Sequence, residues 1–138
     1  MEMNMKKAFT GTLALLLLSS IVTGKGFLSR ETFMNLEKAE KKWGAKPFDP
    51  KEFRNGNQSV RATMAVGLIK SQRYVGKPIS FVREELGEWD GYFESDEIPA
   101  FLVESKDKGS KEAWEILFLV DKTGRHIAEV RIHKNCCD

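Results

Sequence analysis

Two adjacent segments near the C-terminus constrain the fold more than any other part of the chain. Residues 114–120 read WEILFLV, an aromatic and branched run that is typical of a strand. The turn-forming sequence DKTG follows, and in residues 127–133 the apolar Val130 and Ile132 alternate with polar residues. The pattern predicts two antiparallel strands joined by a hairpin, with one face of the sheet buried.

A short segment upstream carries both a helix start and a helix stop. Residues 76–87 read GKPISFVREELG. Pro78 suits the first position of a helix, and Gly87 suits the position just after its end. Val82 and Leu86 are four residues apart and share one face. A helix this short is unstable alone, so we expect it to be held by burying these two side chains against the sheet.

Two longer helices are predicted before it. Ser29 is a candidate N-cap for a first helix that ends at Gly44, before two prolines. Ser59 is a candidate N-cap for a second helix that runs to about Gln72. Gly67 lies inside that second helix, where it costs about 1 kcal/mol relative to alanine. We therefore expect another backbone to approach the helix closely at this glycine.

The order of the elements indicates an α+β fold. Residues 101–103 form a short apolar run after Pro99, and Tyr92 with Phe93 is a candidate start for a further strand. Helices first and strands afterwards predict a two-layer sandwich, with the N-terminal helices packed on an antiparallel β-meander of three to four strands. We divide the chain into a helix with a proline-containing linker at 25–56 and a compact α+β domain at 57–138.

Residues 1–24 have the pattern of a secretory signal peptide. Lys6 and Lys7 precede an apolar run of about 15 residues, and small residues follow at 22–24. The run is shorter than the roughly 20 residues that span a bilayer, so a cleaved signal is favoured over an uncleaved anchor. This predicts a periplasmic or secreted bacterial protein with no stable transmembrane segment after cleavage.

The charge is balanced in total and divided along the chain. Without residues 1–24 there remain 20 basic and 19 acidic residues, which argues against a dedicated nucleic-acid binder. Residues 53–83 contain six bases and no acid, whereas residues 84–104 contain eight acids and no base. Such blocks form a surface for a partner, or they lie together in the fold and neutralise each other.

Aromatic residues accompany the acidic block, and two interpretations of them stay open. They either anchor an interface with another protein or cover the end of the sheet. On the first interpretation, the candidate partner-binding residues are the bases Arg61, Arg73 and Lys77 and the loop residues Trp89, Asp90, Tyr92 and Phe93.

Most of the domain resembles a known family. The segments RATMAVGLIKSQRYVGKPISFVREELGEWDGYF and WEILFLVDKTGRHIAEVRI resemble the SmpA/OmlA family of small bacterial envelope proteins over about residues 60–133. They also resemble the repeat of the β-lactamase-inhibitor protein. The resemblance implies helices on a sheet and an envelope location. Trp89 stands where the family has proline, and the chain lacks the lipid-anchoring cysteine, so we carry over no functional residue.

The sequence contains no pattern of catalytic residues. It has no nucleophile elbow, zinc-protease motif or phosphate loop, and we predict no cofactor and no metal. His126 and His133 are expected on opposite faces of one strand. Adjacent Cys136 and Cys137 either form a strained ring, pair with another chain or stay free. The oligomeric state is left open.

These observations favour a non-enzymatic protein-binding module of the bacterial cell envelope. The alternative is a small-ligand or metal-binding periplasmic protein that uses the acidic aromatic loop at 89–97. The third hypothesis is a hydrolase whose active site has no recognised motif.

Overall fold

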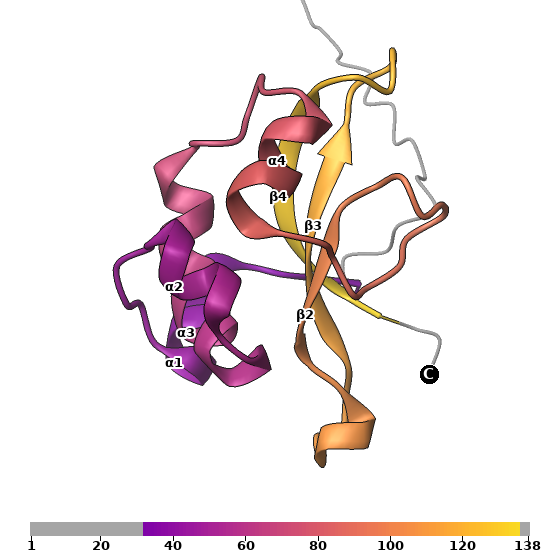
Figure 1. Ribbon diagram of the computed structural model, residues 1–138. Coiled ribbons are helices and arrows are strands. Elements are labelled where there is room, and N and C mark those ends of the chain that lie inside the picture. Colours follow the sequence, from indigo (N-terminus) through magenta and orange to yellow (C-terminus); the bar gives the residue numbers. More distant parts are fainter. Residues whose placement is uncertain (1–31, 136–138) are drawn as a thin grey trace, which may run out of the picture.

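The computed structural model describes residues 32–135, and it shows helices packed against one face of a four-stranded antiparallel sheet (Figure 1). This confirms the predicted α+β class. The predicted signal peptide, the Ser29 cap and Cys136 with Cys137 lie outside the described residues. The elements are β1 (Phe33–Met34), α1 (Leu36–Trp43), α2 (Pro50–Asn55), α3 (Gln58–Ser71), α4 (Ile79–Leu86), β2 (Ala100–Glu104), the 3-10 helix η2 (Lys106–Lys108), β3 (Trp114–Val120) and β4 (Ile127–Lys134).

The sheet has the strand order β1-β4-β3-β2, and all its pairs are antiparallel. The predicted hairpin is confirmed, since β3 pairs with β4 from Trp114 opposite Lys134 to Val120 opposite Ile127. The fourth strand is β1, which pairs with β4 through two residues. Phe93 forms only a bridge to Ser95. The prediction that a strand starts at Tyr92 and Phe93 was therefore wrong.

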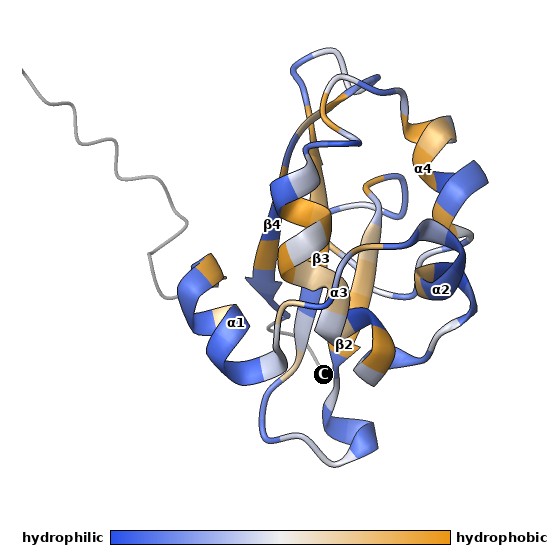
Figure 2. Ribbon diagram, turned by 90° about the vertical axis from the view of Figure 1, so that its left-hand side faces the viewer, coloured by the Kyte–Doolittle hydropathy of each residue, from blue (hydrophilic) through white to orange (hydrophobic). Residues whose placement is uncertain are grey.

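The hydrophobic core lies between the helices and the sheet. Tyr74, Phe53, Phe101 and Phe118 are fully buried and contact one another edge to face, with ring centroids 5.5 to 5.8 Å apart. Such aromatic pairs add stability beyond the area that they bury. The hydropathy colouring shows β3 as apolar and α1 as mostly hydrophilic (Figure 2). No helix in residues 32–135 combines the length and the apolar character needed to cross a membrane.

The first helix starts later than predicted. Phe33 belongs to β1, and the helix begins after Asn35, whose side chain accepts a hydrogen bond from the Lys38 backbone N–H at 2.8 Å. The predicted end is confirmed, because the Gly44 N–H donates to the Glu40 carbonyl at 2.8 Å. Ala39 is the only residue of this helix that is fully buried. The sequence therefore carried little apolar pattern from which the start of the helix could be predicted.

Helix α2 was not predicted, because Pro50 was treated only as a helix breaker. The Asp49 side chain accepts hydrogen bonds from the backbone N–H groups of Lys51 and Glu52, at 2.9 and 3.0 Å. Proline at the first position costs no hydrogen bond there. The result is a six-residue helix that places Phe53 in the core.

Helix α3 begins at a different cap and confirms the role of its glycine. The cap is Asn57, whose side chain accepts from the Val60 N–H at 3.0 Å; the predicted cap, Ser59, lies inside the helix. A Cβ atom on Gly67 would lie 2.9 Å from the Lys46 carbonyl oxygen and 3.0 Å from the Phe48 nitrogen. The linker between α1 and α2 therefore passes directly over this glycine, as the sequence predicted.

Helix α4 is the predicted short helix. Pro78 precedes it, and Gly87 ends it with a φ of 85°. Val82 and Leu86 are buried in the same core cluster as the sheet residues Phe101 and Phe118, which supplies the stability that eight isolated residues lack.

Candidate functional site

The acidic aromatic loop, here residues 87–99, joins α4 to β2 and lies on the sheet face away from the helices (Figure 1). In β3, Ile116 and Phe118 point to the helical core, so Glu115 and Leu117 point to the opposite face. Both are nevertheless fully buried. A Cβ atom on Gly91 would lie 2.6 Å from a Glu115 carboxyl oxygen, which shows how closely the loop covers this face.

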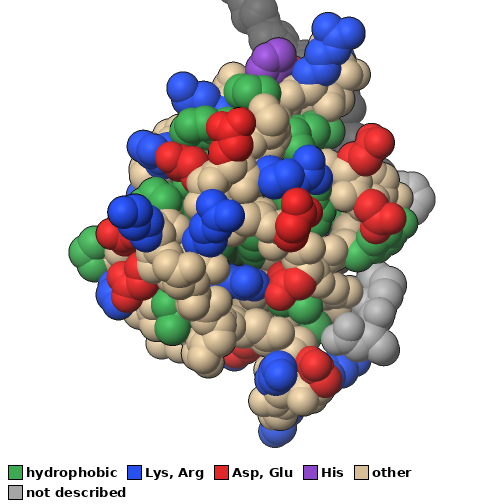
Figure 3. Space-filling model, in the orientation of Figure 1, with side chains coloured by type: hydrophobic (Ala, Val, Ile, Leu, Met, Phe, Trp, Pro, Cys, Tyr) green, Lys and Arg blue, Asp and Glu red, His purple; other side chains and the backbone are tan. Residues whose placement is uncertain are grey.

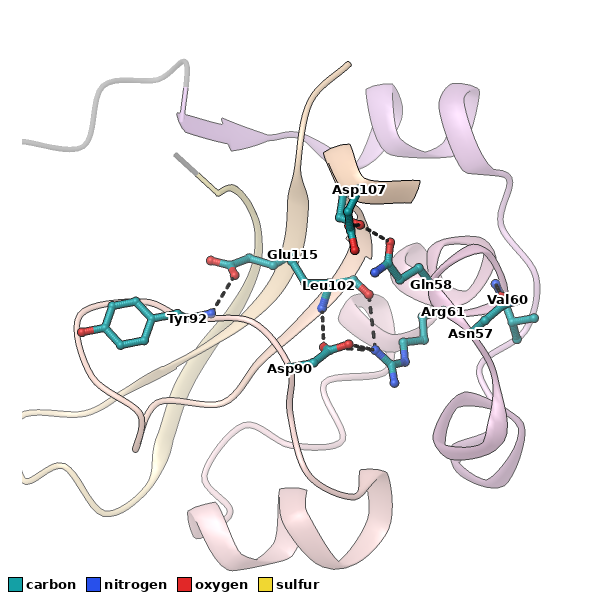
Figure 4. Close-up of polar contacts among 10 residues, drawn as sticks. Asn57, Gln58, Val60, Arg61, Asp90, Tyr92, Leu102, Asp107 and Glu115 are labelled. Atoms are coloured by element: carbon teal, nitrogen blue, oxygen red, sulfur yellow. Dashed lines mark hydrogen bonds and ion pairs between the residues drawn. The ribbon is translucent and has the colours of Figure 1, made fainter. Parts of the chain in front are cut away.

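One end of the loop is fixed by Arg61 and Asp90 (Figure 4). Nη1 of Arg61 lies 3.2 and 3.0 Å from the two carboxyl oxygens of Asp90, and one of these oxygens accepts from the Leu102 N–H at 2.9 Å. The guanidinium carbon lies 5.8 and 5.6 Å from the ring centroids of Phe53 and Phe101. Arg61 thus links α3 to the loop and to β2, and its side chain is only 14% exposed.

The centre of the loop is fixed by Glu115, whose side chain is 0% exposed. Its carboxyl oxygens lie 3.1 Å from Nδ1 of His133, 3.3 Å from the Tyr92 backbone N–H, which donates, and 3.5 Å from the Asn135 amide nitrogen. His133 is also buried, and the centroid of its ring lies 5.3 Å from that of Phe33 and 4.9 Å from that of Phe93. A polar group this deeply buried is stable only with such partners.

The loop aromatics differ in how they are held. Nε1 of Trp89 donates to the Asp96 carbonyl at 3.0 Å, and the Arg83 guanidinium lies 4.5 Å from the Trp89 ring. Phe93 is half-buried against His133. Tyr92 is 55% exposed and is the one large apolar side chain that faces solvent in the described residues. Trp89 and Phe93 therefore pack on the domain, as the second interpretation predicted, whereas Tyr92 points outward and its role at an interface stays a prediction.

The other two candidate bases lie in a separate place, here called the basic groove. It is a shallow hollow of about 700 Å³ lined by Phe48, Pro50, Ser71, Arg73, Lys77 and Phe81. The Arg73 guanidinium carbon and Lys77 Nζ lie 5.7 and 5.3 Å from the centroid of the Phe81 ring. The structure thus divides the seven candidate residues into two surfaces, with Arg61 on the side of the loop.

Arg73 is engaged within the protein. It donates to both carboxyl oxygens of Glu85, at 2.7 and 2.5 Å, and Tyr74 donates its hydroxyl to the same group at 2.8 Å. The hydrogen bond from Arg73 lowers the pKa of Glu85 below its usual value. Burial, followed by the bond to Glu85, raises the pKa of the Tyr74 hydroxyl above its usual value. Arg73 therefore brings less free charge to the basic groove than Lys77 does.

The two charge blocks neutralise each other in part. Arg61 pairs with Asp90 at 3.0 Å, Arg73 with Glu85 at 2.5 Å and Arg83 with Glu88 at 3.1 Å. Figure 3 shows acidic and basic side chains interleaved over one face of the molecule. Among residues 32–135, Lys70 and Lys77 are the members of the basic block whose side chains form no ion pair with an acid and no hydrogen bond to a carbonyl.

Arg61 is expected to contribute to stability rather than to a partner surface. Arg61→Met keeps most of the apolar stem and removes the bond to Asp90, so we expect the free energy of unfolding to fall by about 1 to 2 kcal/mol. Urea denaturation of Arg61→Met, Asp90→Asn and the double variant measures the coupling. Additive losses in the double variant would contradict the pairing.

Sequence reasoning missed Glu115 and did not predict that His133 is buried beside it. The available signal was a lone acid inside an otherwise apolar strand, WEILFLV. His126 is exposed, with Nδ1 3.7 Å from a carboxyl oxygen of Asp121, whereas His133 is buried. In the described part of the chain, no three His, Cys, Asp or Glu side chains gather in a way that would hold a metal ion.

Comparison of the chain with protein-family models, with curated proteins and with solved structures gives no match. The resemblance to the SmpA/OmlA family therefore stays a prediction, and a function has to be argued from the geometry described above.

Proposed function

We propose that the protein is an exported, non-enzymatic binding module that recognises another protein of the bacterial envelope through the acidic aromatic loop, with Tyr92 as the anchor. The observation that carries the proposal is the exposure of Tyr92, at 55%, between Gly91, which bonds to Ala100 of β2, and Phe93, which packs on His133. Tyrosine is enriched among the residues that dominate binding energy at interfaces.

The loop is preorganised, which favours binding. On either side of Tyr92 the chain is held by the Asp90 bond to Arg61 and by the contact of Phe93 with His133. The Tyr92 backbone itself donates to buried Glu115, and its hydroxyl donates to the Glu94 carbonyl at 3.0 Å. Little conformational freedom is left to lose when a partner covers the ring, and a smaller entropy loss strengthens binding.

The charges around the ring define the partner surface. Glu88, Glu94, Asp96 and Glu97 are all exposed on the loop, and only Glu88 of these forms an ion pair within residues 32–135. A partner that fits this loop offers an apolar pocket for the Tyr92 ring with basic residues around its rim. The export of the protein rests on the signal-like residues 1–24, and so does the choice of an envelope partner.

Tyr92→Ala is expected to reduce capture of the partner by about 30-fold, the effect of losing an interface anchor worth about 2 kcal/mol. The side chain is exposed, so the stability of the domain should change by less than about 0.5 kcal/mol. Capture is measured by cross-linking the tagged protein in intact envelopes and quantifying the recovered partner by mass spectrometry.

Two matched variants complete this test. Tyr92→Phe keeps the ring and should retain most of the capture, whereas Lys77→Glu alters the basic groove and should leave capture unchanged. If Lys77→Glu abolishes capture and Tyr92→Ala does not, the partner binds the basic groove and the loop proposal is wrong. If all variants capture the partner as well as the unmodified protein does, neither the acidic aromatic loop nor the basic groove is the binding surface.

A further inference from the structure

The acidic aromatic loop and the basic groove lie on opposite sides of the sheet. The loop covers the sheet face that points away from the helices, and Figure 4 shows Tyr92 and Arg61 on the two sides of Glu115. The groove is formed by the linker before α2, by the end of α3 and by α4 with the segment before it, all on the helical side (Figure 1). One molecule therefore cannot place its own loop in its own groove.

The floor of the basic groove is aromatic. Tyr74 is fully buried, and the centroid of its ring lies 6.0 Å from that of Phe48 and 5.7 Å from that of Phe81. Phe48 and Phe81 are only half-buried, and both line the hollow. The hollow, at about 700 Å³, is larger than one tyrosine side chain. Rings of this kind pack favourably with a further aromatic ring, edge to face or offset-stacked.

The rim of the basic groove carries two cations with N–H groups that remain available. Lys77 is exposed, and its side chain forms no ion pair within residues 32–135. Arg73 bonds to Glu85 through Nε and Nη2, and its Nη1 forms no hydrogen bond with a described residue. Glu85 offsets one of the two positive charges, so the groove as a whole remains positive. These N–H groups can bind carboxylates from outside the molecule.

The acidic aromatic loop has the complementary features. Tyr92 exposes its ring, and the exposed acids Glu94, Asp96 and Glu97 follow it within five positions. Among residues 32–135 none of these three acids forms an ion pair. The loop therefore fits an apolar pocket with a basic rim. Such a pocket is present on this chain itself, in the basic groove.

We propose that the acidic aromatic loop of one copy binds the basic groove of a second copy. The Tyr92 ring packs between Phe48 and Phe81 of the second copy, and the acids of the loop face its Lys77 and Arg73. This inference rests on the proposed function, because it uses the loop as a binding surface and names one of its partners. A second copy and another envelope protein would compete for the same tyrosine ring.

The contact joins two different surfaces, so a pair of copies leaves one loop and one groove unoccupied. Such head-to-tail contacts continue from copy to copy until a rotation closes a ring. We therefore expect the average mass to rise beyond that of a dimer as the protein concentration increases. Salt screens the attraction between exposed charges, so the association should weaken at high ionic strength.

Sedimentation velocity of the protein purified from cell envelopes measures this association. A reductant is present, so that Cys136 and Cys137 cannot link copies. Tyr92→Ala should weaken the association about 30-fold, as the loss of an interface anchor does. Lys77→Glu should weaken it at least about tenfold, because it places like charges together. An equal mixture of the two variants should form a complex of two copies and nothing larger, because one intact loop meets one intact groove.

Lys108→Glu is the matched control. It changes the net charge by the same amount as Lys77→Glu, but it lies on η2, at the end of the molecule opposite α4 (Figure 1). It should associate as the unmodified protein does. The mixture is the control for folding, since a variant that had lost its fold would not restore the complex.

Three results would overturn the inference. They are a monomeric unmodified protein at every concentration, an association that neither Tyr92→Ala nor Lys77→Glu weakens, and a mass that stops at a dimer, which indicates a symmetric contact. The proposed function is tested separately, because Lys77→Glu keeps its loop and should still capture another envelope protein. A monomeric protein whose capture depends on Tyr92 would overturn this inference alone. If neither capture nor association depends on Tyr92, both proposals are wrong.

Discussion

Glu115→Ala is expected to lower the free energy of unfolding by about 3 kcal/mol. The carboxyl group is fully buried and contacts the His133 ring, the Tyr92 backbone and the Asn135 amide. Removing it leaves buried polar groups without partners and opens a cavity, and each effect is destabilising. Chemical denaturation of the purified protein, followed by circular dichroism, measures the loss.

Glu115→Gln is the matched control. It keeps the shape of the side chain and one acceptor oxygen, so we expect a smaller loss than for alanine. Hydrogen exchange at the Tyr92 amide gives a second measurement, because this N–H donates to Glu115 and should exchange faster in Glu115→Ala. Slow exchange at Tyr92 in the alanine variant would show that other contacts hold the loop.

Phe53→Ala is expected to cost about 4 kcal/mol, in the range typical of deleting a buried aromatic ring. Phe53 is 0% exposed, and its ring lies edge to face on Phe101 with centroids 5.5 Å apart. It also carries the Arg61 guanidinium at 5.8 Å. The change therefore removes core packing and one support of the ion pair that holds the acidic aromatic loop.

Phe48→Ala is the comparison for this variant. Phe48 packs on Phe53 from the linker between α1 and α2, with centroids 6.0 Å apart, but it is only half-buried. Its truncation should cost less than that of Phe53, as thermal denaturation of both variants would show. Equal losses would mean that α2 contributes no more to the core than the linker does.

The parts of the fold that were predicted correctly are those whose signal is local. The hairpin of β3 and β4 follows from the alternation of apolar and polar residues around a four-residue turn. Helix α4 follows from Pro78 at its start and Gly87 at its end. The close approach at Gly67 was also predicted, because glycine inside a helix is unfavourable unless something needs the space.

The errors arose where one residue type has two structural uses. Pro50 ends one element and begins another, and only the Asp49 cap distinguishes the cases. Phe33 fits a helical pattern, yet it pairs with His133, a residue 100 positions away. β1 has two residues, too few for any alternation to appear in the sequence.

The candidate site was harder to predict than the fold, because the roles of its residues depend on tertiary contacts. The charge blocks were visible in the sequence, but whether Arg61 meets a partner or Asp90 depends on how α3 lies beside the loop. Burial of Glu115 likewise depends on Gly91, which lets the loop reach the sheet, and on His133 in another strand. Sequence patterns give the residue types of such a site, and the tertiary structure decides which of them face solvent.

The pairing of β1 with β4 has a mechanical consequence. Phe33 lies opposite His133, so the chain enters and leaves the described domain at the same end of one antiparallel pair. A pulling force applied through residues 32 and 135 would separate these two strands one hydrogen bond at a time, because the bonds run across the strands. Tension between the two ends would therefore open the sheet at β1 first, while the core between α3 and β3 stayed closed.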